Sequence, residues 1–123
     1  MNAQEMYARD NGACVACGRT TGLTTQHRHN RGQGGVHGAG EAASERPSNR
    51  CTLCFDCNQA LERDARFAQT GRRNGWKLTE GEDPAKVAIF VVLFREWRRL
   101  DDEGGYRIVD GREPDEMVWE AAA

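Results

Sequence analysis

The chain has 123 residues, which is enough for one domain with a modest core and too few for two independent domains. Hydrophobic residues make up 38% of it and charged residues 29%, and no apolar run approaches the roughly 20 residues that cross a bilayer. Because residues 1–10 lack the apolar segment of a secretory signal, we expect a soluble, cytoplasmic protein.

The net charge of −2 is distributed unevenly along the chain. Residues 1–78 carry 11 basic and 7 acidic side chains, whereas residues 79–123 carry 6 basic and 12 acidic ones. Contacts with nucleic acid need positive charge, so they are expected in the first segment. Residues 79–123 form an acidic C-terminal extension, which could also bind a protein partner. An ordinary mixed surface is the alternative interpretation.

Five segments up to residue 71 have recognisable local patterns. Residues 1–12 indicate a short helix that ends at an Asn-Gly pair, and residues 23–29 alternate with β-branched side chains as a strand does. Residues 30–48 hold five glycines and a proline without periodicity, which is typical of a functional loop. A second short strand over 49–53 and a helix over 56–71 follow. Four arginines are expected on the outer face of this helix: Arg63, Arg66, Arg72 and Arg73.

The last part of the chain is first apolar and then acidic. Residues 87–100 begin with an apolar run rich in β-branched side chains, which favours a buried strand, with a helix as the alternative. Residues 101–105 are predicted to be the loop of a β-hairpin between 97–100 and 106–109. Residues 112–123 are expected to be frayed or weakly helical.

Four of the five cysteines form two Cys-x-x-Cys pairs, Cys14 with Cys17 and Cys54 with Cys57. In a reducing compartment such pairs indicate metal binding rather than disulfides. Four thiolates close a tetrahedral shell, so the predicted ion is a structural zinc, Zn²⁺, without an open position for substrate. A redox pair or four buried small side chains are the alternatives. Cys51 is interpreted as a packed core thiol, with a replacement ligand as the alternative.

Five short motifs follow one another in a fixed order. They are Cys14-Val-Ala-Cys17-Gly, Leu23-Thr-Thr-Gln-His27-Arg, Arg31-Gly-Gln-Gly-Gly35, Asn49-Arg-Cys-Thr-Leu-Cys54 and Cys57-Asn-Gln-Ala-Leu-Glu62. In order and spacing they resemble the HNH endonucleases of the ββα-metal (His-Me finger) group, particularly small phage-encoded members with a four-cysteine zinc site. The resemblance covers residues 14–78. We therefore expect a single α+β domain over residues 1–123, a zinc-stapled ββα-metal core with an N-terminal helix and a C-terminal β-hairpin extension.

The resemblance also implies the roles of three residues. His27 would be the general base that draws a proton from water, Asn49 would steady the hairpin and the base, and Asn58 would face a catalytic metal ion at the start of the helix. Neutral imidazole suits this task near neutral pH, and a cation stabilises the negative charge that develops on the phosphate. The implied function is a metal-dependent endonuclease that cleaves double-stranded DNA with Mg²⁺ or Mn²⁺.

Two positions depart from the commonest form of the motif. The residue before the base, usually an Asp or a His that helps to bind the catalytic ion, is Gln26, and the final motif histidine is Asn58. Because each neutral amide contributes only a dipole, we expect a weak Mg²⁺ or Mn²⁺ site that forms largely together with DNA. The alternative function is a catalytically weakened zinc module that binds DNA or a protein partner.

Other residues near the motifs have expected contacts. Arg28 and Arg31 are candidates for phosphate contact. His29, two residues after His27, is the rival general base, and a solvent or phosphate contact is its alternative role. His37 is expected to be a mobile polar side chain of the glycine-rich loop.

Further packing contacts are predicted from spacing and size. Glu62 and Arg66 stand at i and i+4 of the predicted helix, which favours an ion pair. Trp76 and Trp97 are expected to pack against that helix and against the C-terminal strands, respectively.

Overall fold

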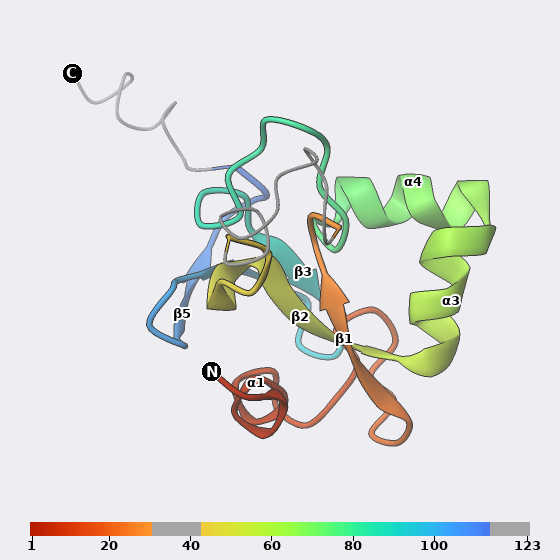
Figure 1. The fold of residues 1–123 in the computed structure, drawn as a ribbon, viewed down its shortest axis with the longest axis horizontal. Helices are drawn as coiled ribbons and strands as arrows, with labels where there is room; N and C mark the ends of the chain where they lie inside the picture. Colours follow the sequence, from red (N-terminus) through yellow and green to blue (C-terminus); the bar gives the residue numbers. More distant parts are fainter. Residues whose placement is uncertain (31–42, 114–123) are drawn as a thin grey trace.

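Residues 1–30 and 43–113 are described in a computed structural model of the chain (Figure 1). They form a mixed α+β structure in which three α-helices accompany two small antiparallel sheets, and the predicted class is confirmed at this level. Within these two ranges no helix has the length and apolar character needed to span a membrane. The elements are α1 (Ala3–Arg9), β1 (Leu23–His27), the 3₁₀ turn η1 (Pro47–Asn49), β2 (Arg50–Cys54), α3 (Phe55–Arg63), α4 (Ala65–Arg73), β3 (Ile89–Val91), β4 (Glu96–Leu100) and β5 (Tyr106–Val109).

The N-terminal helix α1 is short and capped at both ends. The Asn2 side chain accepts a hydrogen bond from the Glu5 N–H at 2.9 Å, and the Glu5 carboxylate accepts one from the Asn2 N–H at 2.8 Å. Asn11 and Gly12 follow the helix with φ of 64° and 65°, a left-handed pair that ends it. The predicted helix is therefore confirmed, with narrower bounds than residues 1–12.

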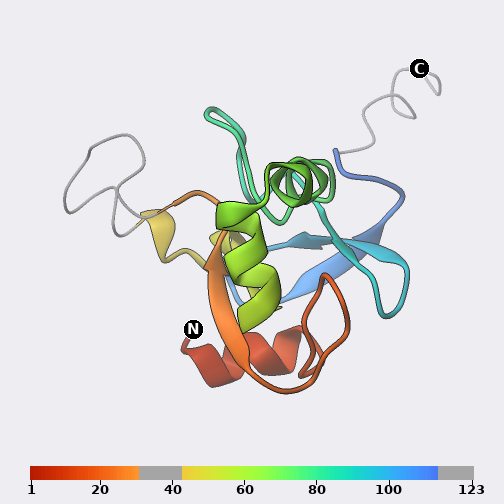
Figure 2. The ribbon, with the colours of Figure 1, turned by 90° about the vertical axis from the view of Figure 1, so that its right-hand side faces the viewer.

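Strands β1 and β2 form an antiparallel pair, as the two predicted strands suggested. Their register places Leu23 opposite Cys54 and His27 opposite Arg50. All residues of β2 are buried, because α1 and α3 both pack against this strand. Helix α3 begins directly after β2 and lies beside β1 in both views (Figures 1 and 2). The order of strand, strand and helix predicted for this part of the chain is thus observed.

The helix predicted over residues 56–71 is two helices that meet at Asp64. The Asp64 carboxylate accepts a hydrogen bond from the backbone N–H of Arg66 at 2.9 Å and so caps α4, which runs in a new direction (Figure 1). The break separates Glu62 from Arg66, and Glu62 lies 3.9 Å from Lys77 Nζ instead. The predictions of one continuous helix and of a Glu62–Arg66 ion pair are therefore wrong.

The C-terminal region is a three-stranded antiparallel sheet in the order β3, β4, β5. Residues 87–100 are strand and turn rather than helix, which confirms the β interpretation, and the buried strand is limited to β3. Arg95 adopts φ of 53° in the turn between β3 and β4. Residues 101–105 join β4 to β5 as the predicted hairpin loop. The predicted state of residues 112–123 falls largely outside the described ranges.

The two sheets share one hydrophobic core, so β3 belongs to the same packed unit as β2. As predicted, Trp76 packs against a helix and the half-buried Trp97 against a C-terminal strand: the ring centroids of Trp76 and Phe67 are 5.9 Å apart, and those of Trp97 and Phe90 are 5.2 Å apart. The Trp76 indole N–H also donates to the Phe90 carbonyl at 2.8 Å, which joins the segment after α4 to β3. The buried core residues are Cys14, Val15, Cys51, Leu53, Cys54, Leu61, Trp76, Ile89, Val91 and Leu100.

Candidate metal centre and hairpin site

Four cysteine side chains meet at one point, as their spacing predicts. Cys14 and Cys17 lie in the turns after α1, Cys54 ends β2, and Cys57 lies in the first turn of α3. Their sulfur atoms all lie within 4.8 Å of one another, a separation that suits ligands of a single ion. The cluster can therefore hold a metal ion, and its four sulfur donors are the set typical of structural metal sites.

Local backbone geometry forms each half of this cluster. The Gly18 N–H donates to the Cys14 carbonyl at 2.8 Å, and Gly18 adopts φ of 82°, so the chain turns tightly just after Cys17. In the other half, Cys54 is the N-cap of α3, and its sulfur accepts the Cys57 N–H at 3.4 Å. One half is thus shaped by a tight turn and the other by a helix start.

The thiols of the cluster differ in acidity. Burial raises the pKa of Cys14 and of Cys57 above the ordinary 9.0. Burial acts on Cys54 in the same direction, but hydrogen bonds, first that of the Cys57 backbone N–H, outweigh it and lower the pKa of Cys54. Cys54 therefore loses its proton more readily than Cys14 or Cys57, and a divalent cation would stabilise their thiolates as well.

Cys51 lies outside the cluster and in the core. It is fully buried, and this burial raises the pKa of its thiol to about 12. A thiol in this setting stays neutral and packs as a small apolar side chain, as predicted. The four clustered sulfurs do not include it.

His27, at the end of β1, is held by a residue that the sequence analysis did not single out. Its Nε2 lies 2.9 Å from Glu45 Oε1, and its side chain is 16% exposed. Arg50, opposite His27 in the strand register, lies 3.8 Å from the second Glu45 oxygen. Because a carboxylate only accepts hydrogen bonds, this contact keeps the imidazole proton on Nε2 and leaves Nδ1 as the acceptor. Glu45 lies in the aperiodic 30–48 segment, where no pattern could have marked it.

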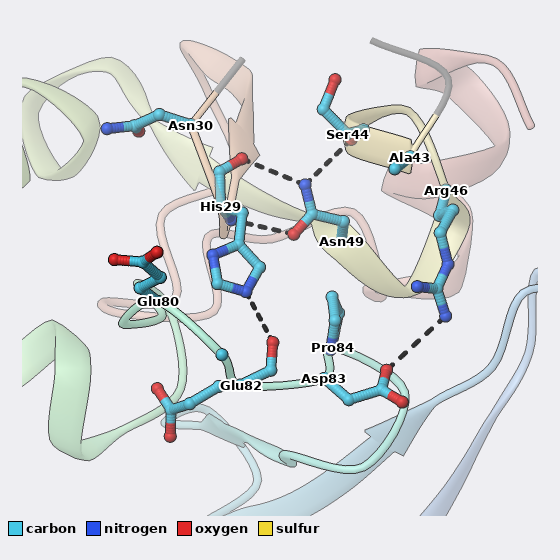
Figure 3. Close-up of a pocket in the computed structure, with 11 residues that line it drawn as sticks. His29, Asn30, Ala43, Ser44, Arg46, Asn49, Glu80, Glu82, Asp83 and Pro84 are labelled. Carbon is cyan, nitrogen blue, oxygen red and sulfur yellow. Dashed lines mark hydrogen bonds and ion pairs between the residues drawn. The ribbon is translucent and has the colours of Figure 1, made fainter. Parts of the chain in front are cut away.

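Asn49 fastens the chain just beyond the hairpin pairs. Its Oδ1 accepts the His29 N–H at 2.8 Å, and its Nδ2 donates to the carbonyls of His29 and Ser44 at 3.1 and 2.9 Å (Figure 3). The side chain is buried, so all its hydrogen-bonding capacity serves the protein. Asn49 thus joins the backbone just after β1 to the segment before η1.

A pocket of about 360 Å³ lies beside His29 (Figure 3). The His29 Nε2 donates to the carbonyl oxygen of Glu82 at 2.6 Å, so this ring joins β1 to the segment before β3. On the far side of the pocket, Arg46 approaches Asp83 at 3.6 Å. The ring of His29 is held by a neutral carbonyl, whereas that of His27 is held by the Glu45 carboxylate, which would stabilise an imidazolium more strongly and so favours His27 as the general base.

The two amides expected to face a catalytic ion have hydrogen-bond partners within the protein. Asn58, in the first turn of α3, donates from Nδ2 to Thr24 Oγ1 at 2.9 Å and to the Thr25 carbonyl at 3.3 Å. Gln26 is 4% exposed and donates from Nε2 to the Trp76 carbonyl at 3.1 Å. Asn58 therefore lies against β1, and Gln26 points to the segment after α4. The carbonyl oxygen of each amide is the atom that could bind a cation.

Arg28 has a structural role, and the prediction that it contacts phosphate is wrong. The residue is 1% exposed, and its guanidinium donates to the carbonyls of Gly75, Ser48 and Pro84 at 2.7, 2.8 and 2.8 Å, and also to that of Val87. Burial lowers the pKa of Arg28 from 12.5 to about 10, so it stays charged at neutral pH. It holds β1, η1 and the segment before β3 together.

Arg31 and His37 belong to residues 31–42, outside the described ranges. The predicted phosphate contact of Arg31 and the predicted mobility of His37 therefore stay predictions. Comparisons with protein-family models, with curated proteins and with solved structures give no match for this chain.

Proposed function

We propose that the protein is a metal-dependent endonuclease of the HNH, ββα-metal type, which hydrolyses phosphodiester bonds of double-stranded DNA. The observation that carries this proposal is the pairing of His27 with Glu45 at the end of the hairpin that Asn49 fastens. An imidazole held by a carboxylate on one nitrogen, with the other nitrogen left to accept a proton, is the group that general-base catalysis needs.

In the proposed reaction, His27 Nδ1 accepts a proton from the attacking water. Glu45 orients the ring and stabilises the imidazolium that forms, because its carboxylate is 2.9 Å from Nε2. Asn49 keeps the backbone beyond the base in place. The carbonyl oxygens of Asn58 and Gln26 would hold Mg²⁺ or Mn²⁺, whose contribution when bound is to stabilise negative charge on the phosphate and the leaving oxygen.

In the proposed scheme, the cysteine cluster stabilises the structure that carries this site. Zinc is the ion that suits four thiolates in a tetrahedral arrangement, and a closed shell gives it a structural role. Cys54 and Cys57 flank the start of α3, and Asn58 follows directly. A zinc ion in the cluster would therefore fix the helix end that carries Asn58 relative to β1.

A second candidate is a zinc module that binds DNA or a protein partner without cleaving DNA. The hydrogen bonds that the amide nitrogens of Gln26 and Asn58 donate within the protein favour this second candidate. They hold the two amides in place, and binding an ion would require another orientation. In this case the acidic extension over residues 79–123 would be a further surface for a protein partner.

Nicking of supercoiled plasmid in a series of Mg²⁺ and Mn²⁺ concentrations separates the two candidates. The wild-type protein is expected to nick DNA, and His27→Ala is expected to lower the rate at least about 100-fold, since general-base catalysis contributes roughly 10²–10⁴. His29→Gln is the matched control, because glutamine can still donate to the Glu82 carbonyl, and its rate should stay near that of the wild type. Absence of nicking by the wild type, or equal nicking by His27→Ala, would reject the endonuclease and favour the binding module.

A further inference from the structure

Three exposed arginines without a carboxylate partner among the described residues lie close together in the sequence. Arg63, Arg66 and Arg73 are exposed and form no ion pair with another described residue. They lie at the end of α3 and along α4. The arginines that do form ion pairs are Arg9, Arg19, Arg46, Arg50, Arg98 and Arg112.

Helix α4 presents one polar face to solvent. Phe67 packs against Trp76, and Gly71 faces Leu61 so closely that an added Cβ would lie 2.4 Å from the Leu61 Cδ2, which fixes the inward side. Residues at i, i+3 and i+7 share a helix face. On the opposite side this spacing brings together three exposed residues, which we call the arginine face: Arg66, Gln69 and Arg73.

The positive charge of the arginine face is not neutralised locally. Helix α4 itself contains three arginines and no acidic residue. Neither of the two carboxylates nearest in the sequence forms an ion pair with these arginines: Glu62 lies 3.9 Å from Lys77 Nζ, and Asp64 accepts backbone N–H groups at the start of α4. A chain with a net charge of −2 therefore carries a local cationic surface on this helix.

The arginine face is tied to the strand that carries His27. The segment directly after α4 runs alongside β1: the Gln26 side chain donates to the Trp76 carbonyl at 3.1 Å, and the Leu78 N–H donates to the Arg28 carbonyl at 2.9 Å. Figure 1 shows α4 running back from the end of α3 toward the C-terminal end of β1. The C-terminal end of α4, with Arg73, is thus held next to the hairpin.

We propose that the arginine face of α4 binds backbone phosphates of duplex DNA beside the hairpin site. This inference rests on the proposed function for its choice of DNA as partner. Arg66 and Arg73 are about 10 Å apart along the helix axis, since each residue rises about 1.5 Å. That span corresponds to roughly three phosphates of one strand, spaced about 3.4 Å along the duplex axis. Gln69 between them can donate to a phosphate oxygen or a sugar.

Fluorescence anisotropy of a labelled duplex tests the proposal without any cleavage. Wild type and the double variant Arg66→Gln/Arg73→Gln are titrated at several salt concentrations in buffer without added divalent ions. The affinity of the variant at low salt should fall about 10- to 100-fold, and the slope of log affinity against log salt should fall by about 2, one for each lost phosphate contact. Thermal melting should be unchanged, because both side chains are exposed.

Arg95→Gln/Arg107→Gln is the matched control, since it removes two exposed arginines that lie elsewhere, one in the turn between β3 and β4 and one on β5. Its affinity and salt slope should equal those of the wild type. The proposal is overturned if the α4 variant binds like the wild type, if the control loses as much affinity, or if the wild type does not bind the duplex. A loss of binding confined to the α4 variant, in a protein that never nicks DNA, would reject the nuclease and retain the DNA-binding face.

Discussion

The hairpin unit, formed by β1, β2 and α3, and the C-terminal sheet, formed by β3, β4 and β5, are stabilised in different ways. The C-terminal sheet buries apolar side chains, among them Ile89, Val91 and Leu100. The hairpin unit buries apolar side chains too, such as Leu53 and Leu61, and in addition it buries uncharged polar ones. Gln26 and Thr52 are buried there, Asn49 is buried directly before β2, and each is hydrogen-bonded within the protein. For each of these three residues, at least one hydrogen-bond partner is distant in the sequence.

This difference explains where the proposed chemistry lies. Burial of apolar surface stabilises a sheet without fixing the orientation of any polar group, whereas a network of buried hydrogen bonds orients side chains at a smaller gain in stability. A two-stranded hairpin is marginal by itself in water. The hairpin unit therefore depends on the cysteine cluster and on contacts with its neighbours, and it is there that His27 is positioned.

Removal of the metal ion is expected to have the largest effect. Binding of a structural zinc contributes roughly 10 kcal/mol or more to folding, which is comparable to the whole stability of a small domain. After complete chelation, or in Cys57→Ser, the amides of β1 and β2 should exchange at least about 100-fold faster, and those of β4 and β5 should keep more of their protection. Hydrogen exchange followed by mass spectrometry measures this.

Cys51→Ala is the control for metal removal, because Cys51 is buried beside the cluster but outside it. This variant should keep one metal ion per chain and lose about 1 kcal/mol of unfolding free energy from lost packing. If the amides of β1 and β2 stay protected from exchange after the metal is removed, the hairpin unit is stable without the ion. That result would contradict the contrast with the C-terminal sheet.

Replacement of Arg28 is expected to have the next largest effect, because this side chain joins the two regions. Arg28→Met would leave the four carbonyls of its partners, including those of Gly75 and Pro84, without donors in the interior. We expect a loss of about 3–5 kcal/mol in the free energy of unfolding. Urea denaturation with saturating zinc measures it. Arg107→Met, on the exposed surface of β5, should change the same quantity by less than about 0.5 kcal/mol, and equal losses would contradict the assigned role.

The smallest predicted effect concerns the ion pair between Glu82 and Arg112. The hydrogen bond from Arg112, assisted by those from Thr79, lowers the pKa of Glu82 from 4.5 to about 2. A depressed carboxyl pKa stabilises the fold above pH 4.5, and this stabilisation is lost as the pH falls toward 2. Glu82→Gln should therefore be about 2 kcal/mol less stable than the wild type at pH 6, and the difference should shrink by pH 3. Urea denaturation of both proteins at each pH checks this, and a constant difference would contradict it.

Local patterns made part of this structure predictable. Two Cys-x-x-Cys pairs mark a metal cluster because each pair is formed by a turn within the motif, as the Gly18 turn and the α3 cap show. The strands around His27 and the β interpretation of residues 87–100 follow from side-chain alternation and β-branched content. These signals need no knowledge of distant contacts.

The errors concern residues whose environment is set by distant segments. Arg28 belongs to a motif of mostly polar residues, and the four carbonyls that it contacts belong to residues between positions 48 and 87. Asp64 ends one helix and caps the next, and the packing of α4 against α3 involves the close approach of Gly71 to Leu61. Glu45 reaches His27 from a segment without periodicity. Tertiary packing decides all three, and no local pattern encodes it.

Chemical rescue of His27→Ala by imidazole tests most directly whether His27 acts as the general base. Removal of the side chain leaves space beside Glu45, where free imidazole can accept the proton that His27 Nδ1 would have taken. Nicking by His27→Ala should rise with imidazole concentration, while its zinc content stays constant and the wild type is unaffected. A His27→Ala variant that nicks as fast as the wild type, or one that stays inactive at every imidazole concentration, would contradict it.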